Sequence, residues 1–564
     1  MRFEQRRRLL IVSLCLFLAF ASTASSVVQG QGRAASRVSR PQIKLVVGLM
    51  IDQFRADYLV RFRDQFVSGG LERLLDGGAV FANAHYIHVP TYTACGHATF
   101  MSGASPSLNG IIGNEWFDRT LNKRVTSVSD DSVKLLTGAS SDAAGASPSK
   151  LLGSTLGDEL RLASEGESKV VGIAFKDRSA ILPAGKRPNG AYWFDNKSGG
   201  FVSSTYYFSE LPEWVRKFNR DVRAERYFGK KWERLLPEAA YSRSRPDNAP
   251  EEKSIFGTTF PYTINGGENA VGPRFYAQFE MTPFGNEFAI EFARAAIENE
   301  ALGADSIPDL LTLSLSANDL LGHTYGPYSQ EVQDMVLRTD RMLADFFTYL
   351  DRKVGMNNVV IALSADHGVA PIPEMIAEQG FGGRIGARVV PTAVTAALTS
   401  QFGSGEWIRQ YVNGNVYLDE TIIETKKLDK KAVELAACAA AITVRGIGSC
   451  YTRSDLIAGS LPQDRVARAV ASGFYAARNG NIIAVPEPFW FVAEGIATTH
   501  GGPYSYDTHV PVILYGPGFI AGRYTEESSP ADIAPTLAAL LNLTPPSNYV
   551  GRVLSEALAK RPLR

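Results

Sequence analysis

The chain has 564 residues, of which 45% are hydrophobic and 21% are charged, and its 58 basic and 58 acidic side chains give a formal net charge of zero. This balance argues against a nucleic-acid-binding surface, because such a surface needs a surplus of basic side chains to hold phosphates. The apolar and aromatic content excludes a largely disordered chain. Four cysteines are too few for a fold built on disulfides.

The N-terminal segment is typical of a signal peptide. Arg2 and the run Arg6–Arg8 precede an apolar stretch from Leu9 to Phe20, interrupted only by Ser13, which is shorter than the roughly 20 residues that a stable membrane span needs. Small residues follow, and cleavage after Ala24 fits the pattern of exported proteins. We therefore predict a signal peptide over residues 1–24, a linker over residues 25–42, and a periplasmic or secreted protein without a membrane anchor after cleavage. An uncleaved anchor is the alternative.

Export would place the mature chain in an oxidising compartment. Cys15 leaves with the signal peptide, and Cys438 and Cys450 are close enough in sequence to pair across a short loop. Cys95 would then remain as a small, buried, unpaired residue.

Five short apolar runs predict strands that are buried on both faces of a sheet. They are Ile43–Ile51, Val170–Phe175, Leu310–Leu315, Val359–Leu363 and Val510–Tyr515. Between them, Ser329–Val354 has apolar residues at helical spacing, and Asp532–Leu543 follows Pro530 as a second helix. Alternating strands and helices indicate an α/β fold, with a mostly parallel sheet that carries helices on both faces.

Two long stretches interrupt this alternation. Residues 181–280 are rich in aromatic and turn-forming residues, and residues 371–495 combine glycine-rich loops with an alanine-rich helix. We interpret both as insertions that cap the sheet. The predicted catalytic core is then divided into residues 43–180, 281–370 and 496–564.

Residues of the types that bind metals follow several of the predicted strands. They are Asp52, the pair Asp319 and His323 four residues apart, and the pair Asp366 and His367, while His500 lies immediately before the Val510 strand. The carboxyl ends of parallel strands meet at one edge of a sheet, where functional residues gather. Three carboxylates and three imidazoles there match what two zinc ions need, with three protein ligands for each ion and one open position.

The segment Pro90–His97 supplies a nucleophile. It passes from an extended approach into a predicted helix start, where a hydroxyl group would lie among unsatisfied backbone N–H groups suited to phosphate. Thr91, Thr93 and Cys95 are all possible on chemical grounds, and Thr93 could equally be an ordinary helix cap.

These segments together resemble the alkaline phosphatase superfamily, and within it the exported, phosphate-irrepressible alkaline phosphatases that use a threonine nucleophile. The motifs that carry the resemblance are GLMIDQFRADYL, PTYTACGH, GIIGN, FKDRSAILPAG, SANDLLGH and SADHG, in the order of the family. They extend the resemblance over nearly the whole mature chain.

The resemblance implies a role for each site residue. One zinc would be held by Asp52, Thr93, Asp366 and His367, and the other by Asp319, His323 and His500. His509 lies in the same loop as His500 and is the alternative ligand. Thr93 would be the nucleophile, with Asn114, Lys176 and Arg178 as ligands of the phosphoryl group. His85, His88 and His97 match no ligand position.

Charge then predicts the class of substrate. Two zinc ions against three aspartates and a threonine alkoxide leave the site near neutral, so Lys176 and Arg178 add two positive charges that match a phosphate monoester dianion. We therefore expect a zinc-dependent alkaline phosphatase that acts on small-molecule phosphate monoesters through a phosphothreonine. A nucleotide pyrophosphatase/phosphodiesterase of the same superfamily is the nearest alternative, and a non-catalytic exported phosphate-ester-binding protein is a more distant one.

Overall fold

A computed structural model describes residues 42–137, 143–377, 379–493 and 495–559. The predicted signal peptide, and the predicted linker apart from Gln42, lie outside these ranges. Within them, no helix is both long and apolar enough to cross a bilayer.

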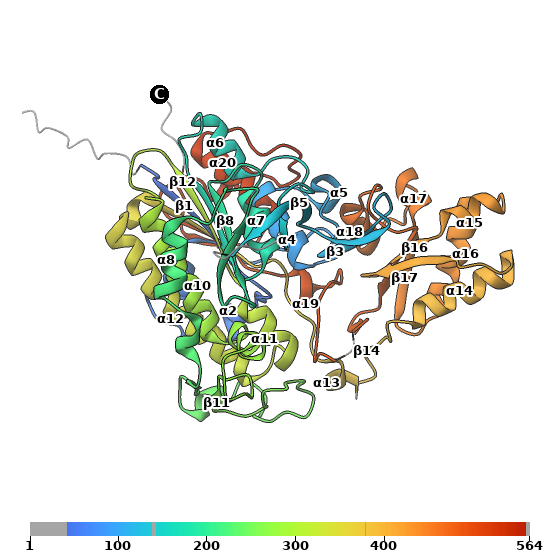
Figure 1. Cartoon of the computed structure of the whole chain (residues 1–564), viewed down its shortest axis with the longest axis horizontal. Coiled ribbons are helices and arrows are strands. Elements are labelled where there is room, and N and C mark those ends of the chain that lie inside the picture. Colours follow the sequence, from blue (N-terminus) through green and yellow to red (C-terminus); the bar gives the residue numbers. More distant parts are fainter. Residues whose placement is uncertain (1–41, 138–142, 378, 494, 560–564) are drawn as a thin grey trace, which may run out of the picture. The chain divides into compact units, whose positions relative to one another are not determined.

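An eleven-stranded sheet forms the centre of the fold (Figure 1). Its strands, in spatial order, are β21 (Gly522–Tyr524), β2 (Ala79–Phe81), β20 (Val512–Tyr515), β13 (Val359–Ser364), β1 (Leu45–Ile51), β12 (Asp309–Leu315), β7 (Val170–Ala174), β8 (Gly190–Asp195), β9 (Gly200–Ser204), β5 (Ser129–Leu136) and β6 (Ala144–Ala146). The five strands from β13 to β8 run parallel to one another. The predicted α/β fold with a largely parallel central sheet is confirmed.

Both faces of the sheet are covered, as continuous apolar strands require. In β1, Leu45, Val47 and Leu49 point to one face, where they join the core formed with the helices α10 (Pro283–Asn299) and α12 (Gln330–Lys353). Val46 and Met50 point to the other face, toward α4 (Thr93–Ser102), α6 (Leu156–Ala163) and α20 (Ile533–Leu541). This alternation follows from the two-residue repeat of a strand. It also places the end of β1 in the interior of the molecule.

The edges of the sheet differ from the prediction. β20 lies antiparallel to β13 and β2, and β8, β9, β5 and β6 are joined by antiparallel pairs on the other side of β8. β8 and β9 fall within residues 181–280, which we expected to form a cap, although they belong to the main sheet. Their aromatic side chains, including Tyr192 and Phe201, are buried in the core rather than exposed on an insertion.

Residues 389–486 contain a second, four-stranded sheet (orange, Figure 1). Its order is β15 (Ile408–Val412), β16 (Asn415–Leu418), β18 (Ile482–Pro486) and β17 (Ile447–Thr452). The helices α14 (Val389–Phe402), α15 (Glu420–Thr425) and α16 (Lys430–Ile442) lie in this stretch, together with two further helices given below. The expected disulfide joins Cys438 of α16 to Cys450 of β17, and Cys95 is unpaired and buried.

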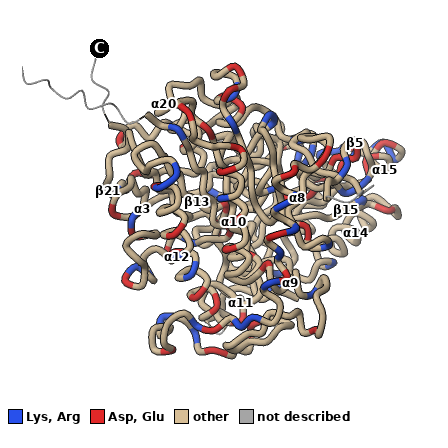
Figure 2. Tube along the Cα trace, turned by 60° about the vertical axis from the view of Figure 1, so that its left-hand side comes forward, with Lys and Arg blue, Asp and Glu red and all other residues tan. Residues whose placement is uncertain are grey.

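Shorter elements complete the described chain. The remaining strands are β3 (Glu115–Asp118), β4 (Lys123–Thr126), β10 (Lys231–Trp232), β11 (Tyr262–Thr263), β14 (Gly383–Arg384) and β19 (Trp490–Phe491). The other helices are α2 (Tyr58–Arg61), α3 (Leu71–Gly77), α5 (Pro106–Asn109), α7 (Asp177–Ala184), α8 (Glu213–Asp221), α9 (Pro273–Glu280), α11 (Ala317–Tyr325), α13 (Pro373–Ala377), α17 (Arg453–Ala458), α18 (Arg465–Gly473) and α19 (Ser505–Thr508). Basic and acidic residues are interspersed along these elements (Figure 2).

Candidate metal centre

The predicted metal ligands come together just beyond the carboxyl ends of three neighbouring strands. Asp52 directly follows β1, Asp366 and His367 follow β13, and Asp319 and His323 lie on α11 directly after β12. The loop before α19 adds His500. Two groups result, and within each group the donor atoms lie within 4.8 Å of one another. We call them the Asp52 cluster (Asp52, Asp366, His367) and the Asp319 cluster (Asp319, His323, His500).

The two clusters are adjacent. The rings of His367 and His500, one from each cluster, are stacked with their centroids 3.4 Å apart. Five of the six side chains are buried, and His323 is partly exposed. A small region can therefore contain two cations, which would share the surrounding negative charge.

The histidines are oriented as metal ligands. In each of them Nδ1 faces a backbone carbonyl, at 2.8 Å for His323 and His500 and 2.9 Å for His367. A carbonyl only accepts hydrogen bonds, so Nδ1 carries the proton and the Nε2 lone pair faces the carboxylates. Nε2 of His367 lies 3.4 Å from Asp366. Nε2 of His323 lies 3.3 Å from Asp319, and Nε2 of His500 lies 3.5 Å from the same residue.

The carboxylates also suit bound cations. Oδ1 of Asp52 and Oδ2 of Asp366 are buried and lack a hydrogen-bond partner. Burial and the nearby charge of Asp366 raise the pKa of Asp52 well above its ordinary value, against the opposing charge of Lys176. Buried carboxylates of this kind are stable when they are paired or bound to a metal. The donor set, with nitrogen and oxygen ligands in groups of three, fits zinc.

Burial keeps two of the imidazoles neutral, which metal binding requires. It lowers the pKa of His367 to about 3, in spite of the attraction of Asp366, and it also lowers the pKa of His500. In the Asp319 cluster, burial opposes ionisation of Asp319, but the charge of Lys176 and then that of His323 outweigh it and hold the pKa of Asp319 well below its usual value. The clusters therefore offer two neutral imidazoles and at least one firmly ionised carboxylate, whereas the charge of Asp319 outweighs burial and raises the pKa of His323.

Thr93 is the first residue of α4 and lies against the Asp52 cluster. Its Oγ1 is 3.4 Å from Nε2 of His367. The close approach depends on Gly96, one turn along the helix, because a Cβ atom there would lie 2.2 Å from the carbonyl oxygen of Asp366. The hydroxyl is thus placed beside free N–H groups at a helix N-terminus and beside a predicted metal ligand.

The other nucleophile candidates lie differently. Thr91 Oγ1 donates a hydrogen bond of 3.0 Å to the carbonyl of Gly502, and Cys95 Sγ donates to the carbonyl of Ile111 at 3.2 Å. Cys95 is completely buried, which raises the pKa of its thiol. Of the three, Thr93 is the side chain next to a metal-ligand cluster.

The three predicted phosphoryl ligands surround the same region. Asn114 accepts a hydrogen bond of 2.9 Å from the N–H of Ala94 through Oδ1, which leaves its NH₂ group as a donor. Lys176, the N-cap of α7, donates to Asp52 at 2.8 Å and to Asp319 at 2.5 Å, so its ammonium group lies between the two clusters. Arg178 is partly exposed, and its Nε has no hydrogen-bond partner.

The two histidines of the last loop are separated in space. His500 belongs to the Asp319 cluster, whereas His509 bonds to the carbonyl of Ala82 through Nε2 and stacks on His85. Of the two alternatives that the sequence left open, His500 is the one placed near the other ligands.

Sequence reasoning missed several supporting side chains. Gln53 donates to Asp319 at 2.6 Å through Nε2, and its backbone N–H donates to Asp366 at 3.1 Å. It is a buried non-glycine residue with a φ of +60°, a strained conformation that often marks a functional site. Asn318 donates to the carbonyl of Asp52, and His97 lies 3.2 Å from Oδ2 of Asp366. Only the position of Gln53 directly after Asp52 could have pointed to it.

Several known proteins are similar to this chain in sequence and structure. The alkaline phosphatase PhoV of Synechococcus elongatus is 36% identical over 559 residues, which cover 98% of this chain and 99% of the relative. The alkaline phosphatase PafA of Elizabethkingia meningoseptica is 36% identical over 95% of this chain and 98% of its own. A protein of Myroides odoratus named calcium-transporting ATPase is also 36% identical, over 97% of this chain and 98% of its own.

A crystal structure of wild-type PafA superposes with a TM-score of 0.86 and covers 92% of this chain and 99% of that structure. Residues 46–510 match the family described as type I phosphodiesterase / nucleotide pyrophosphatase. The resemblance to the alkaline phosphatase superfamily is thereby confirmed, and the chain belongs to the type I phosphodiesterase / nucleotide pyrophosphatase family.

Proposed function

We propose that this protein is an alkaline phosphatase that hydrolyses phosphate monoesters through a covalent phosphothreonine at Thr93, with two zinc ions bound by the Asp52 and Asp319 clusters. The observation that carries the proposal is the juxtaposition of two Asp/His clusters with a threonine hydroxyl at a helix N-terminus. Two zinc ions, when bound, would neutralise the charge that develops on the attacking and leaving oxygens.

The residues of the chain divide the remaining work. Thr93 gives up its hydroxyl proton to solvent, and its Oγ attacks phosphorus and forms a P–O bond. The bond to the ester oxygen breaks, and the alkoxide leaves with the electron pair and takes a proton from water to become the alcohol. Water then attacks the phosphothreonine, which releases inorganic phosphate and restores the threonine. Asn114 and Arg178 donate hydrogen bonds to the phosphoryl oxygens, and Lys176 contributes a positive charge between the clusters.

The relatives support this reading. PhoV and PafA are named alkaline phosphatases, and each covers nearly the whole of this chain. A second solved structure of PafA carries substitutions at one threonine, one asparagine, one lysine and one arginine. The same four residue types occur here in the same order and at the same spacing, as Thr93, Asn114, Lys176 and Arg178.

Lys176 and Arg178 favour monoesters over the diester and pyrophosphate substrates named for the family. A diester carries one negative charge and a second bulky group, so two cationic side chains beside the phosphoryl position gain less from binding it. The more distant alternative, a protein that binds phosphate esters without catalysis, is disfavoured because the nucleophile and both clusters are present.

Export and the identity of the metal are further parts of the proposal. The disulfide between Cys438 and Cys450 supports export, because such bonds persist in oxidising compartments. It agrees with the predicted signal peptide over residues 1–24.

For the domain organisation we propose a catalytic core in three parts and an insertion over residues 371–495, as predicted from the sequence. The first insertion begins after β9 and not at residue 181, because β8 and β9 belong to the main sheet.

Replacing the proposed nucleophile tests the mechanism. Thr93→Ala should reduce hydrolysis of phenyl phosphate by at least about 10³-fold while the zinc content is unchanged, and Thr93→Ser, which keeps a hydroxyl group, should retain much of the activity. Rates and zinc content measured on the same preparations provide the comparison. Thr93→Ala protein with the activity of the parent would disprove the assignment of the nucleophile.

A further inference from the structure

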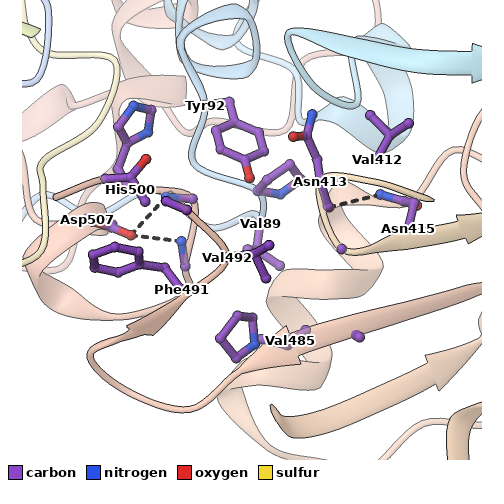
Figure 3. Close-up of a pocket in the computed structure, with 18 of the residues that line it drawn as sticks. Val89, Tyr92, Val412, Asn413, Asn415, Val485, Phe491, Val492, His500 and Asp507 are labelled. Atoms are coloured by element: carbon purple, nitrogen blue, oxygen red, sulfur yellow. Dashed lines mark hydrogen bonds between the residues drawn. The ribbon is translucent and has the colours of Figure 1, made fainter. Parts of the chain in front are cut away.

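A cavity of about 360 Å³ lies beside the Asp319 cluster and has no role in the mechanism so far (Figure 3). Its lining on one side comes from Tyr92 and the loop of His500, and on the other from the turn between β15 and β16 and from β18. Phe491 and Val492 complete the wall. The volume is within the range of small-molecule sites, near its lower end.

The position of Thr93 determines which part of a substrate would reach this cavity. Thr93 lies against the Asp52 cluster, through its contact with His367. In an in-line displacement the leaving oxygen is opposite the attacking one, and therefore on the side of the Asp319 cluster. His500 belongs to that cluster and also lines the cavity. The alcohol part of a bound monoester would consequently point toward the cavity.

The lining selects against a charged ligand. Arg124 is the one lysine or arginine among the lining residues that the structure describes, and it forms an ion pair of 3.1 Å with Glu115, which also lines the cavity. Much of the remaining wall is aromatic or aliphatic, with Tyr92, Tyr411 and Phe491 among its members. Aromatic rings bind well between such walls, while a second phosphate or carboxylate would find no uncompensated positive charge.

The walls are preformed. The β15–β16 turn is Asn413–Gly414, with φ angles of +51° and +78°, the conformation of a two-residue hairpin turn. Gly414 packs so closely that a Cβ atom there would lie 2.7 Å from the carbonyl of Ala484. On the opposite side, Tyr92 packs against Gly501, where a Cβ atom would lie 2.6 Å from the ring. Little ordering would be needed on binding, which favours affinity.

We propose that this cavity binds the leaving group of the monoester and gives the enzyme a preference for uncharged alcohols that carry an aromatic ring. The inference rests on the proposed function, since it assigns the specificity of the same site. It predicts selectivity in kcat/KM that depends on the ring and not on how easily the alcohol departs.

Two alkyl phosphates isolate the effect of the ring. 2-Phenylethyl phosphate and ethyl phosphate both release a primary alkoxide of similar leaving ability, and they differ in a phenyl group placed two carbons from the oxygen. Burial of that ring should raise kcat/KM for 2-phenylethyl phosphate by about tenfold or more over ethyl phosphate. Equal values for the two esters would overturn the inference.

Variants of the cavity wall test its location. Val492→Trp fills the cavity and Tyr411→Ala removes an aromatic wall, and both should reduce the preference for the ring to less than about threefold while ethyl phosphate is hydrolysed as before. Val550→Trp and Tyr549→Ala are matched controls at exposed positions and should keep the full preference. A preference that survives both wall variants would place the ring elsewhere and contradict the proposal.

Binding of the ring can be measured without turnover. 2-Phenylethanol, titrated by calorimetry into the metal-loaded protein, should bind the parent and the two controls but not Val492→Trp. Absence of binding to the parent would count against the cavity itself. If no monoester is hydrolysed but 2-phenylethanol binds as described, the proposed function fails while the ring site stands.

Discussion

Lys176 lies between the two groups of proposed metal ligands, where its positive charge can also attract a bound phosphate ester. Its ammonium group contacts both Asp52 and Asp319, and Arg178 lies two residues further along, with an Nε that has no hydrogen-bond partner. Replacing both by alanine should lower kcat/KM for phenyl phosphate by about 10²- to 10³-fold, because donors to the charged transition state are lost. The loss for methyl phenyl phosphate, a diester with one negative charge, should be much smaller.

Kinetics on the two esters check this prediction, with Lys217→Ala/Arg220→Ala as a control pair of exposed residues on α8. Equal losses on the monoester and the diester would remove the charge argument for substrate class.

His88 gives a pH dependence that is independent of the metal centre. It is fully buried beside Thr99, and burial lowers its pKa to about 4. In the unfolded chain His88 takes up a proton near pH 6.5, whereas in the folded protein it does so only near pH 4. The contribution of His88 to the free energy of unfolding is therefore fully present above pH 6.5 and is lost as the pH falls toward 4. The contribution is roughly 3 kcal/mol for a shift of this size.

Denaturant unfolding of the parent and of His88→Gln at pH 7 and pH 4.5 measures this contribution. The difference in unfolding free energy between the two pH values should be smaller in the variant. The same pH dependence in both proteins would show that His88 is not the group responsible.

Individual ligands could be predicted because each follows a strand whose end lies at one edge of the sheet. Asp52, Asp366 and the pair on α11 all have this origin, and the structure brings them together. His500 could not be separated from His509, since both lie in a loop whose path depends on tertiary contacts. Gln53 and His97 were missed for the same reason, because their contacts join segments far apart in sequence.

Among the elements, α16 and β17 have a covalent link of their own. The disulfide between Cys438 and Cys450 spans 12 residues, and closing a loop of this length stabilises a fold by about 2–4 kcal/mol. Cys438→Ser/Cys450→Ser should therefore lower the thermal midpoint of the protein, and the parent should show a similar decrease with reductant. The double variant itself should not respond to reductant. An unchanged midpoint in the reduced parent would contradict a stabilising role.

The predicted elements agree best with the structure where strands are buried on both faces. β1, β7, β12 and β13 were all anticipated from continuous apolar runs, and α12 from helical spacing. β8 and β9 were assigned to an insertion because their aromatic residues and the turn between them resemble a surface loop. Their place in the sheet depends on packing against α10, through contacts such as Phe201 with Phe292, which short-range patterns do not contain.

At the scale of the whole molecule, the two larger sheets contribute to different parts of the proposed site. The proposed metal ligands and the proposed nucleophile lie around the carboxyl ends of strands of the main sheet, on α4, α11 and adjoining loops, and the second sheet supplies part of the wall of the adjacent cavity. Chemistry and specificity therefore depend on different segments of the chain. This division explains why substitutions at Tyr411 or Val492 are expected to change substrate preference while the reaction itself is retained.

The overall charge balance of 58 basic and 58 acidic residues has a local counterpart. In the proposed metal-bound site the charges of two zinc ions, three aspartates and the threonine alkoxide nearly cancel, and Lys176 and Arg178 then provide the attraction for a dianion. Affinity for phosphate is thus concentrated at one position and does not require a basic surface.

The most direct test of this account is the ratio of kcat/KM for phenyl phosphate to that for methyl phenyl phosphate, measured on one preparation of known zinc content. We predict about two zinc ions per chain, a preference for the monoester of at least about 100-fold, and loss of both activities with a chelator. A preference for the diester, or full activity without metal, would contradict it.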